Sequence, residues 1–133
     1  MSLVFADSFY FIARLNRRDQ HHEKAVRFFR SPDMHLLTSE WILVEVADGL
    51  AKSEVRPRLR EIIDDLRQSS LCEIVPVSTA LFNRALDLYH ERTDKQWTLT
   101  DCTSFLIMQE RGIKEALTGD RHFEQAGFTA LLK

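Results

Sequence analysis

The stretch WTLTDCTSFLIMQERGIKEALTGDRHFEQAGF, residues 97–128, contains the clearest succession of structural elements in this chain. Its apolar run predicts a helix over Asp101–Glu110, and Gly112 is the residue type that commonly ends a helix. A short strand candidate, Glu115–Thr118, follows directly, and the Gly-Asp step after it is typical of a turn. A helix that leads through a short link into a strand is the repeating unit of an α/β fold.

The rest of the chain continues this alternation, without a linker, a repeat or a low-complexity segment. Strands are predicted at Met1–Ala6, His35–Thr38, Leu71–Val77 and Phe128–Leu132. Helices are predicted at Phe9–Leu15, Gln20–Arg30, Glu40–Ala51, Arg58–Arg67 and Thr79–Arg92, with a short turn or helix at Phe123–Ala126. Ser31-Pro32-Asp33 stops the second of these helices, and Ser39 can cap the third. The 133 residues therefore predict a single α/β domain, 1–133, with a mostly parallel sheet.

Composition and charge exclude several classes of protein. The formal net charge is −2 at pH 7, so a polyanionic partner would have to be held by local basic patches or by bound cations. Cys72 and Cys102 lie in apolar runs and are expected to be small buried side chains rather than a disulfide. The histidines form no zinc pattern, no apolar stretch is long enough to span a membrane, and the N-terminus does not resemble a signal peptide. A soluble, cytoplasmic protein is expected.

Four acidic residues lie far apart in apolar surroundings, where an isolated charge is unfavourable. They are Asp7 in LVFADSFYFIA, Glu45 in WILVEVADGL, Asp101 in WTLTDCTSFLIM and Asp120 in EALTGDRHF. A carboxylate in such a setting must be paired, hydrogen-bonded, protonated or bound to a metal. Asp7 and Asp120 each follow a predicted strand, and ligand sites of open α/β sheets lie beyond the carboxyl ends of the strands.

Three of these residues also have a purely structural interpretation at a helix start or turn. Asp7 suits an ordinary turn or N-cap, and Gly119-Asp120 is common turn chemistry. Thr98-x-x-Asp101 resembles a capping box, although Thr100 is a second candidate for the cap. The sequence alone leaves both interpretations open for each of the three.

Glu45 is harder to explain structurally, because its apolar neighbours leave it no obvious polar face. The alternative is a partly buried carboxylate paired with an arginine such as Arg14 or Arg17. The four acidic residues together favour a metal site, since bare carboxylates in one place would repel one another and a divalent cation relieves that repulsion. Hard oxygen ligands of this kind are the ones that Mg²⁺ or Mn²⁺ prefers.

The chain resembles the PIN-domain ribonucleases, most closely the VapC-type toxins of bacterial and archaeal toxin–antitoxin pairs. Residues 97–128 are similar to the C-terminal half of that family. VFADSFYFIARL, residues 4–15, resembles the first strand of the family and the Asp-Ser/Thr step after it. LLTSEWILVEVADGL, residues 36–50, resembles the segment that carries the family's glutamate. The resemblance covers nearly the whole chain and rests on the order and spacing of these segments rather than on a single motif.

The resemblance implies a PIN-like three-layer α/β/α fold with a five-stranded, mainly parallel sheet, and endoribonuclease activity that depends on Mg²⁺ or Mn²⁺. Carried over position by position, it implies that the catalytic residues and metal ligands are Asp7, Glu45, Asp101 and Asp120. Ser8 and Thr118 occupy positions that can support a neighbouring carboxylate or a bound water, and local backbone bonding is their alternative role. The family likeness also implies a homodimer and an antitoxin protein that blocks the site.

The resulting hypothesis is metal-assisted hydrolysis of an RNA phosphodiester, for which no protein nucleophile is needed or recognisable. RNA would have to approach an acidic pocket, so basic residues are expected around it. The candidates follow the acidic segments in the chain and are Arg14, Arg17, Arg18, Lys52, Arg56, Arg58, Arg60, Lys95, Arg121 and His122. Most of them are expected to be solvated surface charges, while as a group they suit a sequence-independent grip on phosphates.

Three other functions are compatible with parts of the pattern. A phosphatase or DNA nuclease could use the same acidic residues, and a panel of RNA, DNA and a phosphate ester would distinguish them. A PIN-like module could bind RNA or protein without cleaving it, although four intact acidic positions argue against this. A flavodoxin-like or response-regulator-like domain also gathers acidic residues at strand ends, but the chain has no pair of adjacent acids after its first strand.

Overall fold

The central element is a five-stranded sheet in which every pair of neighbouring strands is parallel. The computed structural model describes residues 2–29 and 33–133. The strands are β1 (Ser2–Ala6), β2 (Met34–Ser39), β3 (Cys72–Val75), β4 (Glu115–Leu117) and β5 (Thr129–Ala130). Their order across the sheet is β3-β2-β1-β4-β5, which places β1 at the centre. The predicted α/β fold is confirmed, and the sheet is parallel throughout.

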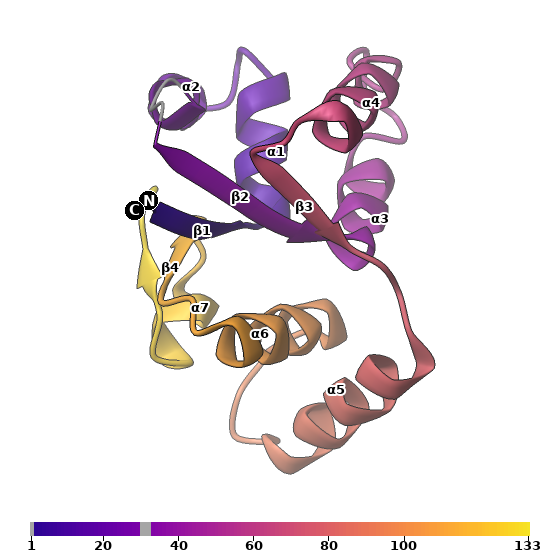
Figure 1. Cartoon of the computed structure of the whole chain (residues 1–133), viewed down its shortest axis with the longest axis vertical. Coiled ribbons are helices and arrows are strands. Elements are labelled where there is room, and N and C mark those ends of the chain that lie inside the picture. Colours follow the sequence, from indigo (N-terminus) through magenta and orange to yellow (C-terminus); the bar gives the residue numbers. More distant parts are fainter. Residues whose placement is uncertain (1, 30–32) are drawn as a thin grey trace.

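Helices cover both faces of the sheet and produce three layers (Figure 1). One layer contains α1 (Ser8–Leu15), α2 (His22–Phe29), α3 (Glu40–Gly49) and α4 (Arg58–Gln68). The other contains α5 (Thr79–Glu91), α6 (Leu99–Arg111) and α7 (Arg121–Gln125).

The change of face follows from the order of the strands. The chain moves from β1 to β2 and β3 in one direction, and then returns past β1 to β4 and β5 in the other. Right-handed crossovers put the connecting helices of the two directions on opposite faces. The gap between β1 and β4 is therefore the topological switch point, which is where open α/β sheets place their ligand sites.

The core forms because the central strand is apolar on both sides. Residues 4–6 of β1 are buried one after another, as expected for a parallel strand covered on both faces. In the second helix layer, Phe105 packs edge-on against Trp97 and Phe123, with ring centroids 5.0 Å apart in both pairs. These aromatic contacts hold α6 against the start of α7 and so fix two helix N-termini relative to each other.

The predicted boundaries agree with those of the described elements within two residues. The largest differences have local causes. β3 stops at Val75 because Pro76, which has no N–H, follows it. The last strand is reduced to Thr129–Ala130, since its neighbour β4 is itself only three residues long.

Two helix ends are also corrected. The third predicted helix ends at Gly49, two residues early, with Leu50 as its C-cap. α6 begins at Leu99 because Thr98, and not Thr100, is its N-cap. The predicted stop at Ser31-Pro32 lies outside the described residues.

The remaining expectations from composition concern cysteines and membranes. Cys72 and Cys102 are both free thiols; Cys102 is buried as expected, whereas Cys72 is only half-buried. Within the part of the chain that the structure describes, no helix has the length and apolar character needed to cross a bilayer.

Candidate metal centre

Asp7 lies at the carboxyl end of β1, at the switch point beside β4. The residue is buried, with 5% of its surface exposed. The Thr118 hydroxyl, just after β4, donates a hydrogen bond of 2.7 Å to Asp7 Oδ2. Asp7 is also the N-cap residue of α1, but its side chain makes no capping hydrogen bond. The N-cap position therefore does not account for the carboxylate, which Thr118 holds from the neighbouring strand.

Glu45 projects from the middle of α3, the helix that packs beside α1. The Ser8 hydroxyl, in the first turn of α1, donates a hydrogen bond to Glu45 Oε1. Across residues 2–29 and 33–133, no ion pair involves Glu45. A serine thus orients this carboxylate, and the alternative of an arginine partner is not what the structure contains.

Asp101 occupies the third position of α6, where the capping box predicted from the sequence is present. Its amide donates to Thr98 Oγ1, and its Oδ2 accepts from the Thr98 amide, both at 3.0 Å. The same Oδ2 lies 2.8 Å from His122 Nδ1. Capping occupies one oxygen of the carboxylate, so the structural interpretation and a metal-binding role are compatible.

Asp120 caps α7, and its Oδ1 accepts a hydrogen bond of 2.9 Å from the His122 amide. Its Oδ2 lies 3.6 Å from His122 Nδ1. The Asp120 amide donates to Thr118 Oγ1 at 3.0 Å, and the same hydroxyl donates to Asp7. The Thr118 side chain therefore links the two acidic residues that follow β1 and β4.

Gly119 is needed between Thr118 and Asp120 because the Phe9 ring lies against its backbone. A Cβ atom at position 119 would stand 2.5 Å from Phe9 Cζ, well inside the contact distance of two carbons. The absence of a side chain lets α1 and the segment after β4 approach each other, and this approach brings Asp120 towards Asp7.

His122 was predicted only as one of several basic residues around the site. The structure places its imidazole between two of the carboxylates, part-buried, with Nδ1 facing both Asp101 and Asp120. Ligand atoms from these three residues all lie within 4.8 Å of one another. The sequence contains one signal for this role: His122 lies in the first turn of the helix that Asp120 caps, close to the carboxyl end of the preceding strand.

The electrostatics of the four acidic residues show that they share one neighbourhood. The pKa of Asp7 is raised to about 7, mainly by burial; the Thr118 hydrogen bond lowers it, and the nearby charges of Glu45 and Asp101 raise it. Burial likewise raises the pKa of Glu45, with contributions from Asp101 and Asp120. Burial also raises the pKa of Asp101, opposed by its hydrogen bonds. The structure therefore brings together the four acidic residues that were singled out in the sequence.

The donor set fits a divalent cation. For three of the carboxylates, protein hydrogen bonds hold one oxygen, and the other accepts no hydrogen bond from the described residues, although Asp120 Oδ2 lies 3.6 Å from His122 Nδ1. These second oxygens are Glu45 Oε2, Asp101 Oδ1 and Asp120 Oδ2. Carboxylates that are oriented in this way and still have free lone pairs are suited to hard cations, whose charge would offset the repulsion in the cluster.

Seven of the ten basic residues expected around the acidic site line one of two pockets. The first pocket has a volume of about 340 Å³, and its basic residues are Lys95, Arg121 and His122. A second group lines a separate pocket at the far ends of α1 and α3, namely Arg17, Arg18, Lys52 and Arg58. Arg60 faces Asp64 along its own helix at 3.7 Å.

Comparison with known proteins agrees with the fold. The 23S rRNA-specific endonuclease VapC20 of Mycobacterium tuberculosis is 26% identical over 126 residues, which is 95% of each chain. Its crystal structure, described as that of a sarcin–ricin loop cleaving toxin, has a TM-score of 0.84 at the same identity, covering 96% of this chain and 97% of that one.

Two more distant structures share the fold. VapBC2 from Rickettsia felis has a TM-score of 0.66 at 13% identity, covering 96% of each chain. FitAcB from Neisseria gonorrhoeae has a TM-score of 0.61 at 18% identity, covering 96% of this chain and 94% of that one. The profile of the PIN domain matches residues 4–129, a span that includes all or part of every strand and all four acidic positions. The chain belongs to the PIN domain family.

Proposed function

We propose that this protein is a divalent-metal-dependent endoribonuclease that hydrolyses RNA phosphodiester bonds as the toxin of a toxin–antitoxin pair. The observation that carries the proposal is the convergence of four carboxylates at the switch point, three of them with an oxygen left free by the fold. VapC20, the relative that matches along nearly the whole chain, is named a 23S rRNA-specific endonuclease and a sarcin–ricin loop cleaving toxin, which supports the same activity.

The residues of this chain would hold the cation and orient the carboxylates that bind it. Asp7, Glu45, Asp101 and Asp120 are the ligands, directly or through water. A bound Mg²⁺ or Mn²⁺ supplies positive charge beside the scissile phosphate and makes water a better nucleophile. Ser8 and Thr118 each donate a hydrogen bond to a carboxylate and fix which oxygen remains available.

The same residues control approach to the site. Without a cation, the carboxylates repel a phosphate group, so binding of the metal and binding of RNA favour each other. His122 holds Asp101 from the second helix layer and lies within reach of the cluster. Ribosomal RNA is the first substrate to test, because the relative that covers 95% of the chain is named for cleaving it.

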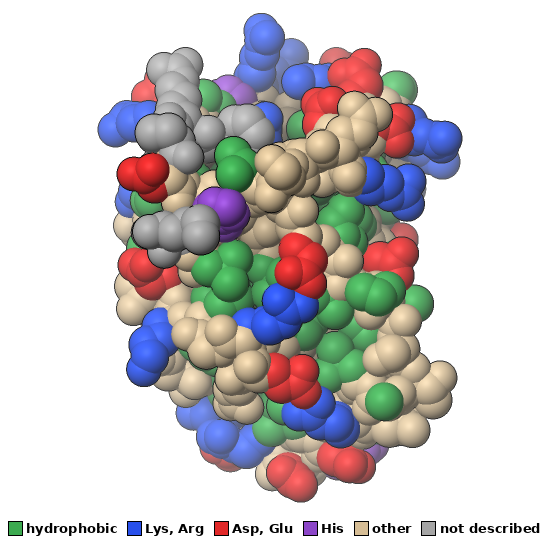
Figure 2. Space-filling view, viewed as in Figure 1, with side chains coloured by type: hydrophobic (Ala, Val, Ile, Leu, Met, Phe, Trp, Pro, Cys, Tyr) green, Lys and Arg blue, Asp and Glu red, His purple; other side chains and the backbone are tan. Residues whose placement is uncertain are grey.

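A protein partner is part of the proposal, since a toxin of this kind requires an antitoxin. Hydrophobic side chains are visible across the middle of the face in Figure 2. Val44 on α3 is 57% exposed and Val77 after β3 is 55% exposed. Contiguous exposed apolar surface can mark a site of protein association. Exposed apolar surface of this kind supports association with an antitoxin and with a second copy of the chain.

The test is cleavage of a mixed RNA pool by the purified protein in Mg²⁺, Mn²⁺ or EDTA. Single-stranded DNA and a small phosphate ester serve as alternative substrates. Asp101→Asn is the inactivating variant, and Asp87→Asn, an exposed acid on α5, is the matched control. We expect metal-dependent RNA products from the wild type and the control alone. Folded wild-type protein that binds RNA but yields no product in either metal would instead identify a non-catalytic binding module.

A further inference from the structure

The helices α1 and α3 run side by side in the same direction from the acidic site. On the side of the acidic site, which we call the near end of the pair, the hydroxyl of Ser8 in the first turn of α1 donates a hydrogen bond to Glu45 in the middle of α3. One turn further along both helices, Gly49 lies against Ile12, whose Cδ1 is 3.2 Å from the position of a Cβ at residue 49. Steps of four residues in each helix keep the two in register. The next turn of both leads to the loops that follow α1 and α3.

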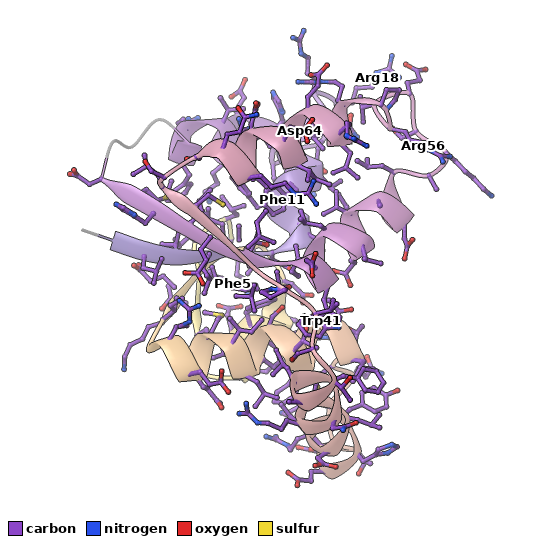
Figure 3. All side chains as sticks on the ribbon, turned by 45° about the vertical axis from the view of Figure 1, so that its right-hand side comes forward. Phe5, Phe11, Arg18, Trp41, Arg56 and Asp64 are labelled. Atoms are coloured by element: carbon purple, nitrogen blue, oxygen red, sulfur yellow. The ribbon has the colours of Figure 1, made fainter. Side chains whose placement is uncertain are left out.

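These loops form a basic pocket of about 460 Å³. Its charged lining consists of Arg17, Arg18, Lys52, Arg58 and one acid, Glu54. Arg18 and Arg56, labelled in Figure 3, lie at this end of the molecule, away from Trp41 at the start of α3. In a chain of formal net charge −2, four cations around one carboxylate are a marked local concentration.

The cations of this pocket are not used in ion pairs. Among the described residues, none of the four has an acidic partner, whereas Arg84 and Arg111 elsewhere are paired with glutamates. Arg58 is oriented by a hydrogen bond of 3.4 Å to the Leu15 carbonyl at the end of α1, which leaves most of its N–H groups available. The ends of α1 and α3 carry partial negative charge, which stabilises cations here before any ligand arrives.

We propose that this pocket, which we call the basic pocket, binds the phosphate backbone of the RNA substrate at a distance from the acidic site. The inference rests on the proposed function. The eight residues of α1, Ser8–Leu15, rise roughly 10 Å at about 1.5 Å per residue, a length that a nucleic-acid strand covers in about three nucleotides at ~3.4 Å each. One strand can therefore contact both places, and neither contact reads base identity.

The division of charge gives the two places different tasks. The acidic site attracts RNA only through its cation, while the basic pocket attracts it directly. Phosphate contacts of this type fix the register of the strand and produce most of the salt dependence of binding.

The test measures RNA affinity as a function of salt. A labelled single-stranded RNA of mixed sequence is titrated with Asp101→Asn protein in Mg²⁺, so that binding is observed without cleavage. In this background, the double variant Arg17→Gln, Lys52→Gln removes two pocket cations whose side chains make no hydrogen bond or ion pair in the described structure. For single strands, the slope of log affinity against log salt should become shallower by about 1.4, or about 0.7 per contact.

The matched control is Arg67→Gln, Lys114→Gln, which removes the same charge from two cations outside the pocket and without acidic partners among the described residues. We expect its salt slope to equal that of the parent. Equal loss in both double variants, or an unchanged slope in the pocket variant, would overturn the basic pocket as an RNA site. If the pocket variant loses binding of a labelled oligoglutamate peptide and retains that of RNA, the pocket docks an acidic protein segment and the proposal is wrong.

The two proposals fail in distinguishable ways. Wild-type protein that cleaves RNA while the pocket variant retains the parent's salt slope leaves the nuclease intact and removes only the basic pocket. Wild-type protein that cleaves no RNA removes the proposed function, whatever the salt slopes are.

Discussion

The two ends of the α1–α3 pair carry opposite charge in opposite surroundings. At the near end, acidic groups are buried and held by hydrogen bonds from other elements, as Asp7 is by Thr118. At the far end, the basic residues of the pocket are exposed; Arg17, Arg18 and Lys52 lie on loops and Arg58 begins α4. Burial of the carboxylates at the near end opposes folding, because each loses hydration. The exposed cations at the far end keep their hydration and have almost no such penalty. A strained, well-positioned site is typical of catalysis, and an exposed cluster is typical of reversible binding.

The largest effect should come from removing a charge at the near end. Asp7→Asn should lower RNA cleavage by ~10³-fold or more, because a cation ligand is lost, which corresponds to about 4 kcal/mol of transition-state stabilisation. The same change should raise the metal-free stability at pH 8 by about 1–3 kcal/mol, since an amide carbonyl still accepts the Thr118 hydrogen bond but has no charge to desolvate. Cleavage rates and urea unfolding measure the two effects.

Asp87→Asn is the control for this variant, because it removes an exposed acid with no partner among the described residues. It should change neither quantity. Full activity in Asp7→Asn, or a loss of stability in it, would contradict the contrast between the two ends.

The second effect is a pH dependence of the metal-free protein. Burial raises the pKa of Asp7 from 3.8 to about 7, so the protonated form is favoured in the folded state. Its contribution to stability is fully present below pH 3.8 and is lost as the pH rises through about 7, a change of roughly 4 kcal/mol at most. The difference in free energy of unfolding between wild type and Asp7→Asn, measured in EDTA from pH 4 to 8, isolates this group.

A saturating divalent cation should make this difference in free energy of unfolding less dependent on pH, because the cation replaces the proton as the partner of the carboxylate. If the free energies of unfolding of the two proteins change in parallel over this range in EDTA, folding does not raise the pKa of Asp7, and the contrast between the two ends is wrong at this residue.

The contrast also separates what the sequence can predict from what it cannot. The capping box of Thr98 and Asp101 is a local pattern over four residues, and it was predicted and found. The positions of Asp7 and Asp120 followed from a general rule about strand ends, which needs only the order of elements. The fold class and every element boundary within two residues depended on similarly local patterns.

The missing parts depend on packing between distant segments. The Thr118–Asp7 hydrogen bond joins residues 111 apart in the chain, so no local pattern contains it, and the expectation that Thr118 supports a carboxylate came from the family resemblance. The position of His122 depends on how Phe105 holds α6 against α7. The basic residues were expected around the acidic site, but the register of α1 along α3 places one group of them at the far end, and register is a property of the tertiary structure.

A third effect should come from His122, which sharpens the near end. His122→Ala removes the imidazole that orients Asp101, and we expect the Mn²⁺ affinity to fall 10- to 100-fold, the usual range for groups that support a metal ligand. Calorimetric titration with Mn²⁺ in the absence of RNA measures this directly. His90→Ala, an exposed histidine on α5, should bind Mn²⁺ like the wild type. An affinity unchanged by His122→Ala would mean that the capping hydrogen bond from Thr98 is enough to hold Asp101.

The smallest effect tests the close approach that assembles the near end. In Gly119→Ala, the new Cβ would meet Phe9 Cζ at 2.5 Å, so the ring or the segment after β4 must move. Overpacking of this kind lowers stability by about 1–3 kcal/mol. Gly49→Ala is the control, since its Cβ would meet only the flexible end of Ile12 at 3.2 Å, and its loss in urea unfolding should be smaller. Phe9→Leu should restore much of the stability lost in Gly119→Ala, because the ring atom responsible for the clash is gone. If the double variant is less stable than the two single changes predict, the Phe9 ring does not cause the loss in Gly119→Ala, and the approach of α1 to Asp120 is not what requires the glycine.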